Sequence, residues 1–320
     1  MNKKNVFGFV FLLAILASGY LLWQNKYNIY DWYTLRNYQP SSQISALASQ
    51  SGMNSYGQKL FYVNDPAVSN KEQFSKECNN NKEQTIVLGC FTGTNIYVYD
   101  VSDARLQGVE EVTAAHEMLH AAYERLSSTE KEKVDKLTSD AFQRINNPRI
   151  SGLVDSYRSQ DPSVVPNELH SILGTEVANL GPELEQYYAK YFTDRSKVVD
   201  FSQAYEGVFS DLKNQVEKYD ADLNLRKSEI DRLEQNLNQQ SDQLASMKKQ
   251  MERYSSSGQT AAFNTMVPAY NQQVNDYNSQ AADYKNLLQE YNNLVQERNK
   301  LATQQQGLVE SLDSRVKTIQ

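Results

Sequence analysis

Residues 116–124 of the chain read His116-Glu117-Met118-Leu119-His120-Ala121-Ala122-Tyr123-Glu124. The stretch has the apolar pattern of a buried helix, on which residues four apart lie on the same face. His116 and His120 can therefore direct both imidazoles toward one Zn²⁺ ion. Glu117 follows the first histidine directly, where its carboxylate can act as general base on a zinc-activated water. The spacing predicts a metal-binding helix over about residues 109–126.

The composition argues against nucleic acid as a partner. The chain has 320 residues, which is enough for about two domains. Its formal net charge is −7 and its sequence pI is about 5.2, so it lacks the excess of lysine and arginine that phosphate binding requires. We therefore expect no nucleic-acid partner.

The N-terminal segment is apolar, and residues 6–23 carry no charge. This length is at the lower end for a transmembrane helix. Lys3 and Lys4 precede the run, which places the N-terminus in the cytoplasm and the bulk of the chain outside it. We interpret residues 1–24 as a cytoplasmic tip and a single-pass anchor in the cell membrane. A cleaved signal peptide is the alternative, because Ala17-Ser18-Gly19 offers small residues.

Residues 25–41 are rich in tyrosine and tryptophan. They are predicted to form a juxtamembrane segment, whose rings either lie at the membrane interface or pack as the first element of the following domain. The two cysteines of the chain, Cys78 and Cys90, enclose a short polar loop. An even pair at this spacing in an exported domain predicts a disulfide, and two buried thiols are the alternative.

Residues 42–200 are predicted to form one compact domain. A helix is expected over residues 42–51 and a strand over residues 57–63. Residues 85–91 and 95–101 are rich in β-branched and aromatic side chains on either side of Thr92-Gly93-Thr94, which predicts a hairpin. Helices over residues 109–126 and 128–146 follow. We therefore expect an α+β domain with a small sheet and active-site helices.

Residues 201–320 have a different character, because glycine becomes rare and a heptad pattern appears. Apolar residues recur in alternating steps of four and three, first over residues 212–254 and again over residues 270–319. A polar stretch at residues 255–267 separates the two series, and Pro268 stands where a second helix could begin. The pattern predicts a long antiparallel coiled-coil hairpin. An intermolecular coil that is broken by the loop also fits the heptads.

A catalytic zinc site needs a third protein ligand, and the helical segment 165–179 is its best source. Here the chain resembles the gluzincin-like zinc metallopeptidases, whose order is a strand, an HExxH helix and a later helix with a glutamate ligand. Residues 85–179 follow that order, which implies a zincin-like fold. By position Glu168 matches the ligand, and Glu176, beside Gly174 and Thr175, is the fallback. In that family an acidic residue usually follows the glutamate ligand by four positions, but Ile172 stands there in this chain. The partner of a zinc-bound histidine is therefore not identified, and Glu176 could fill that role.

The resemblance implies an extracytoplasmic zinc metallopeptidase that is attached to the membrane by its N-terminal helix and cleaves peptide or protein substrates. His170 lies on the opposite face of its helix from Glu168, so it is either a donor to an oxyanion or a structural residue. The strand before the motif helix could align an extended peptide by edge pairing. A non-catalytic scaffold or adaptor that binds a protein partner through its coiled coil is the alternative function.

Overall fold

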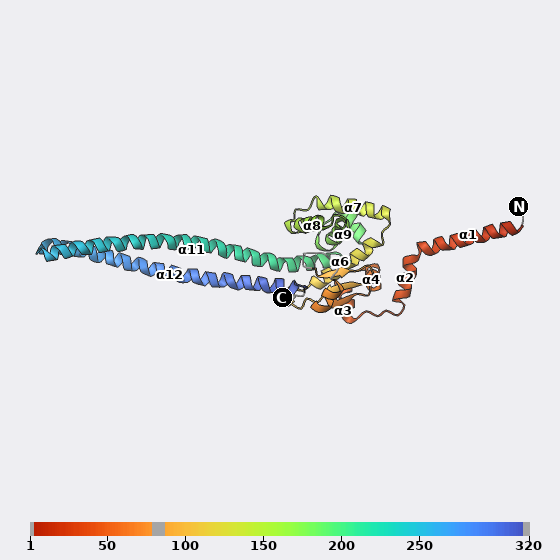
Figure 1. Ribbon diagram of the computed structural model, residues 1–320, viewed down its shortest axis with the longest axis horizontal. Coiled ribbons are helices and arrows are strands. Elements are labelled where there is room, and N and C mark those ends of the chain that lie inside the picture. Colours follow the sequence, from red (N-terminus) through yellow and green to blue (C-terminus); the bar gives the residue numbers. More distant parts are fainter. Residues whose placement is uncertain (1–2, 79–86, 316–320) are drawn as a thin grey trace. The chain divides into compact units, whose positions relative to one another are not determined.

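The computed structural model describes residues 3–78 and 87–315 of the chain (Figure 1). The chain divides into two compact units, which are described separately here. The first comprises Met1–Val208 together with Val309–Gln320, and the second comprises Phe209–Leu308.

The elements in chain order are α1 (Lys3–Gln24), α2 (Lys26–Leu35), α3 (Ser42–Gln50), α4 (Ser55–Val63), β1 (Ala67–Ser69), α5 (Lys71–Glu77), β2 (Gly89–Phe91), β3 (Ile96–Tyr99), the short 3₁₀ helix η1 (Ala104–Leu106), α6 (Val109–Glu124), α7 (Ser128–Phe142), α8 (Pro148–Gln160), α9 (Val165–Glu176), α10 (Pro182–Tyr188), α11 (Ser196–Ser256) and α12 (Thr260–Leu312).

The first unit contains a small sheet in the order β1-β3-β2. The central strand β3 pairs with β1 in parallel and with β2 antiparallel. The predicted hairpin is therefore confirmed where the structure describes it, whereas Thr85 and Ile86 of the expected first strand lie outside the described residues. No strand of this sheet exceeds four residues.

The prediction of an α+β zincin-like domain is wrong, because helices dominate the first unit and the sheet is only three short strands. The expected strand over residues 57–63 belongs to helix α4. The side chain of Asn54 caps this helix by accepting hydrogen bonds from the backbone N–H groups of Tyr56 and Gly57, which starts a helix locally. Leu60 and Phe61 then fall on its buried face.

Helix α6 is the central helix of the first unit. It packs against β2 and β3, against α3 and α4, and against α9. Ala114, Met118 and Leu119 of α6 are fully buried. Helix α9 approaches α6 at Gly174, where a Cβ atom would lie 2.4 Å from Cδ1 of Leu119. The absence of a side chain at Gly174 therefore permits the close contact that brings the two helices of the candidate site together.

Among the helices that the structure describes, none combines the length and the apolar character that crossing a bilayer requires. The predicted transmembrane anchor is therefore wrong, and so is the predicted single-pass location in the cell membrane.

Helix α2 carries the aromatic segment that follows α1. Its Asp31 is 3% exposed, accepts hydrogen bonds from Arg125 at the end of α6 and forms an ion pair with Lys59 of α4. The ring of Tyr27 lies 4.9 Å from the Arg125 guanidinium. Helix α2 therefore packs against the following helices through Asp31, whereas the side chains of Tyr30, Trp32 and Tyr33 on the same helix are exposed.

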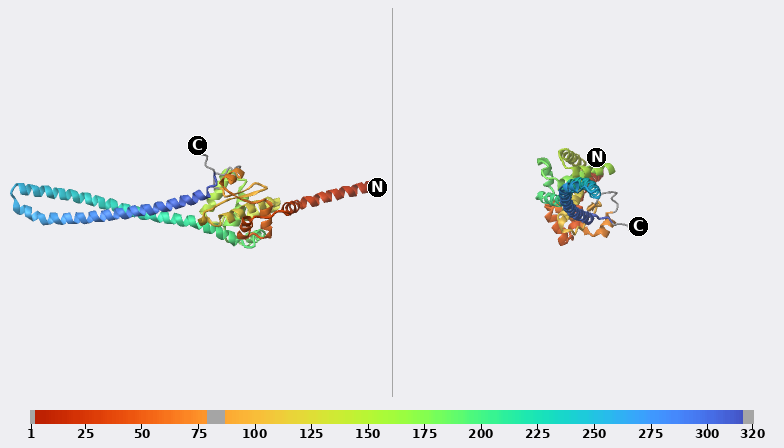
Figure 2. Two further views of the ribbon diagram at one scale, coloured as in Figure 1. Left: turned by 90° about the horizontal axis from the view of Figure 1, so that it is seen from below. Right: turned by 90° about the vertical axis from the view of Figure 1, so that its left-hand side faces the viewer.

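The second unit is a hairpin in which α11 and α12 lie side by side (Figures 1 and 2). Asp220 pairs with Arg298, Arg226 pairs with Glu290, and the Gln273 amide donates a hydrogen bond to Gln243. Positions rise along one helix as they fall along the other, so the two helices are antiparallel. The connection is shorter than the expected residues 255–267, because α11 continues to Ser256 and α12 begins at Thr260. Pro268 consequently lies inside α12 and not at its start.

Candidate metal centre

Three side chains from two helices meet in the first unit. His116 and His120 lie one turn apart on α6, with their ring centroids 4.7 Å from each other. Glu168 lies in the first turn of α9. The Nε2 atom of His116 is 3.6 Å from one carboxylate oxygen of Glu168, and the Nε2 atom of His120 is 3.6 Å from the other. The sequence thus predicted a set of residues that the fold brings together.

The spacing of these atoms suits a tetrahedral ion. One ligand atom from each of the three residues lies within 4.8 Å of the other two. Ligands about 2.1 Å from a tetrahedral zinc lie about 3.4 Å from one another, which is close to the observed separations.

One carboxylate oxygen in the cluster faces a histidine without a hydrogen bond of normal length. The Oε2 atom of Glu168 is buried, lies 3.6 Å from Nε2 of His116 and accepts no shorter hydrogen bond from any residue that the structure describes. Leaving a carboxylate oxygen buried in this way costs free energy unless a cation or a donor compensates it. The residues present therefore fit a zinc ion.

The electrostatics of the cluster favour positive charge between the three side chains. Burial lowers the pKa of His116, but its contact with Glu168 and the carboxylates of Glu117 and Glu176 outweigh this and raise it to about 9. Burial raises the pKa of Glu168, whereas the two histidines and a hydrogen bond from Tyr157 lower it to below its usual range. The carboxylate is thus held in its charged, metal-binding form.

Glu117 is 5% exposed and points toward β2. A Cβ atom at Gly89 would lie 2.7 Å from Oε1 of Glu117 and 2.5 Å from Cγ2 of Thr113. Glycine at this position therefore leaves the room that the Glu117 carboxylate occupies, next to the two histidines on the same helix.

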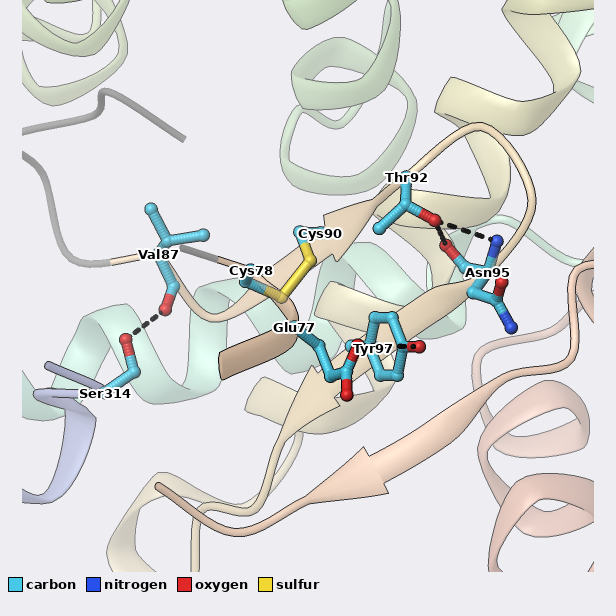
Figure 3. The surroundings of a disulfide bond; sticks show 8 residues. All are labelled: Glu77, Cys78, Val87, Cys90, Thr92, Asn95, Tyr97 and Ser314. Carbon is cyan, nitrogen blue, oxygen red and sulfur yellow. Dashed lines mark hydrogen bonds between the residues drawn. A yellow bond between two sulfur atoms is a disulfide. The ribbon is translucent and has the colours of Figure 1, made fainter. Parts of the chain in front are cut away.

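The strand that carries Gly89 is fixed by the predicted disulfide, which is confirmed. Figure 3 shows Cys78 at the end of α5 linked to Cys90 of β2. Nearby, the Tyr97 hydroxyl of β3 donates to Glu77 at 3.4 Å, and the Ser314 hydroxyl donates to the carbonyl of Val87 at 2.6 Å (Figure 3). The disulfide and the Tyr97 contact thus tie the β2–β3 hairpin to the end of α5, and the Ser314 contact ties down the residues before β2.

The fallback ligand Glu176 is not part of the cluster. Its carboxylate forms an ion pair with Arg149 of α8, whose guanidinium also contacts Glu206 at 3.0 Å. The charge of Glu176 therefore raises the pKa of His116, but Glu176 is not the hydrogen-bond partner of a zinc-binding histidine. Another residue takes that position.

That residue is Ser171, which the sequence analysis did not single out. The hydroxyl of Ser171 lies 3.2 Å from the Nδ1 atom of His120. Tyr157 of α8, which hydrogen-bonds Glu168, was missed as well. Ser171 follows Glu168 by three residues, and this helical spacing is the only sequence signal that could have indicated it.

His170 is fully buried in a cluster of tyrosines and not among the three ligand atoms. Its Nε2 atom lies 2.8 Å from the hydroxyl of Tyr187, and the rings of Tyr123 and Tyr188 pack against its own. Burial, with the nearby histidines, lowers its pKa to about 3. This environment keeps the imidazole neutral.

Comparison with known proteins leaves the geometry as the basis for assigning a function. No protein family, no curated protein and no solved structure matches the chain. The resemblance to gluzincin-like metallopeptidases therefore rests on the motif and on the residues around it.

Proposed function

We propose that the protein is a zinc-dependent metallopeptidase. The observation that carries the proposal is the convergence of His116, His120 and Glu168 within 4.8 Å, beside the carboxylate of Glu117 on the same helix as the histidines. A structural zinc site is usually closed by four protein ligands and needs no general base, whereas the described residues supply three ligands with a carboxylate next to them in the chain.

The proposed roles follow from the chemistry of each group. His116, His120 and Glu168 would hold the ion, which when bound supplies Lewis acidity and lowers the pKa of a water molecule toward neutrality. Glu117 would accept the proton of that water and later deliver it to the amine that leaves the cleaved peptide bond. The near-complete burial of Glu117 limits competing bulk water around this carboxylate.

The substrate would be a peptide or protein segment in an extended conformation. The strand before the motif helix, β3, cannot take an added strand because β1 and β2 occupy both of its edges. Among the described strands, β1 and β2 each have a neighbour on one side only. Of these two edge strands, β2 lies beside Glu117 through Gly89. An extended peptide paired with the outer edge of β2 would therefore pass next to the general base.

The test is hydrolysis of a peptide mixture by the full chain, with new termini identified by mass spectrometry. Chelation should abolish cleavage and added zinc should restore it. Glu117→Gln should retain zinc, and its rate of peptide hydrolysis should be roughly 10²–10⁴-fold lower. Glu111→Gln is the matched control, since Glu111 lies in the first turn of the same helix.

A scaffold function through the α11–α12 hairpin is the competing outcome. In that case neither the unaltered chain nor Glu117→Gln would cleave peptides, with or without added zinc. Peptide hydrolysis that persists in Glu117→Gln would likewise contradict the proposed role of this carboxylate.

A further inference from the structure

The hydroxyl of Ser171 contacts His120 at the ring nitrogen that does not face Glu168. Ser171 is fully buried, and its Oγ atom lies 3.2 Å from Nδ1 of His120. The other ring nitrogen of His120, Nε2, faces Glu168 at 3.6 Å. The two nitrogens of one imidazole thus face two different groups of α9.

This arrangement decides which nitrogen can bind a cation. A neutral imidazole carries one proton, and only the nitrogen without it has a lone pair for a metal. The Ser171 hydroxyl can accept a hydrogen bond from Nδ1–H, which places the proton there and leaves Nε2 free toward Glu168. The same contact restrains rotation of the ring.

A neighbouring hydroxyl shows what a purely structural role on this helix looks like. Thr175 is one turn further along α9 and is also fully buried. Its hydroxyl donates to the backbone carbonyl of Ser171 at 2.8 Å, which is an ordinary bond within one helix. Ser171 instead contacts a side chain on another helix, 51 residues away in the sequence.

We propose that Ser171 is a positioning residue that fixes the proton of His120 on Nδ1 and so prepares Nε2 for zinc. The inference rests on the proposed metal site but does not require that the site be catalytic. Helix α9 then supplies both the third ligand, Glu168, and the group that orients a ligand on α6. A serine performs here the task for which zinc sites often use a carboxylate or a backbone carbonyl.

The test compares zinc binding by three variants of the full chain, by competition with a chromophoric chelator. Ser171→Ala should lower zinc affinity by roughly 10- to 100-fold, the usual effect of losing such a partner. Ser171→Thr, which keeps the hydroxyl, should recover most of it. Thr175→Ala, the matched control, should bind zinc as the unaltered chain does.

Cobalt substitution adds a spectroscopic readout that a packing defect alone would not move. The visible bands of bound Co²⁺ should shift in Ser171→Ala and stay in place in Thr175→Ala. Equal losses of affinity in Ser171→Ala and Thr175→Ala, or no loss in Ser171→Ala, would overturn the proposal. So would an unaltered chain that binds no zinc. Zinc binding without peptide cleavage would refute the peptidase function alone, because the affinity comparison would still decide the role of Ser171.

Discussion

Asp31 and Arg125 form a buried, two-bond ion pair between segments 94 residues apart in the sequence. The two guanidinium nitrogens donate to the two carboxylate oxygens of Asp31 at 3.0 and 2.8 Å. Arg125 is the residue that ends α6, so the pair fastens α2 to the helix that carries both histidines. Lys59 lies 3.0 Å from the same carboxylate.

Asp31→Ala should lower the free energy of unfolding by about 3 kcal/mol, because it leaves the Arg125 guanidinium partly buried without its counter-charge. Urea denaturation followed by circular dichroism measures this change. Asp155→Ala is the control, since the Asp155–Arg158 pair is exposed on both sides and should contribute at most about 1 kcal/mol. Similar small effects for the two variants would show that the α2 contact contributes little to stability.

The end of α9 depends on a second charged contact. Arg195 donates to the carbonyl of Val177 at 2.7 Å and forms an ion pair with Glu185. Burial raises the pKa of Glu185, but the hydrogen bonds from Arg195 and from the Leu180 backbone lower it to below its usual value of 4.5.

Because the pKa of Glu185 is lower in the folded chain than in the unfolded one, its contribution to stability is complete above about pH 4.5 and is lost as the pH falls through the folded-state pKa. Glu185→Gln should therefore be less stable than the unaltered chain at pH 7 and approach it at pH 3. Urea titrations at the two pH values measure the difference. The exposed neighbour Glu183 provides the control Glu183→Gln, and a constant difference between Glu185→Gln and the unaltered chain at both values would contradict the assignment.

The sequence predicted those parts of the site that depend on spacing within one element. His116 and His120 share a face because they are four residues apart on a helix, and α6 has the expected position. The disulfide followed from the count and spacing of two cysteines. The strand over residues 57–63 was predicted wrongly, because its aromatic and β-branched residues outweighed the cap at Asn54 and the helical spacing of Leu60 and Phe61.

Contacts between elements could not be predicted in the same way. The sequence placed Glu168 first and Glu176 as the fallback, but it gave no sign that Arg149 of α8 pairs with the Glu176 carboxylate. The contact between Ser171 and His120 requires the close approach of α6 and α9 at Gly174. No local pattern encodes these distances, since each is set by how two helices pack.

Zinc content should distinguish the two candidate glutamates. After dialysis, the unaltered chain should retain about one zinc per molecule, measured by elemental analysis. Glu168→Ala removes a ligand and should weaken binding by more than the roughly 10- to 100-fold that outer contacts contribute. Glu176→Ala should keep zinc and lose stability instead, because the Arg149 guanidinium loses its partner on α9. Retention of zinc in Glu168→Ala together with its loss in Glu176→Ala would reverse the assignment.

Substitution of Gly89 should displace the carboxylate of Glu117, the proposed general base, without affecting the metal ligands. In Gly89→Ala the new Cβ atom would meet Oε1 of Glu117 at 2.7 Å and its Cγ at 2.8 Å, so the carboxylate must move. A misplacement of a catalytic group by about 1 Å lowers the rate by about 100-fold. We therefore expect peptide cleavage to fall by about that factor, whereas zinc content stays near one per chain. Gly152→Ala is the control, because no heavy atom lies within 4 Å of a Cβ at that position. Loss of zinc together with cleavage in Gly89→Ala would mean that β2 supports the ligands and not Glu117, and unchanged cleavage would remove Glu117 from the proposed mechanism.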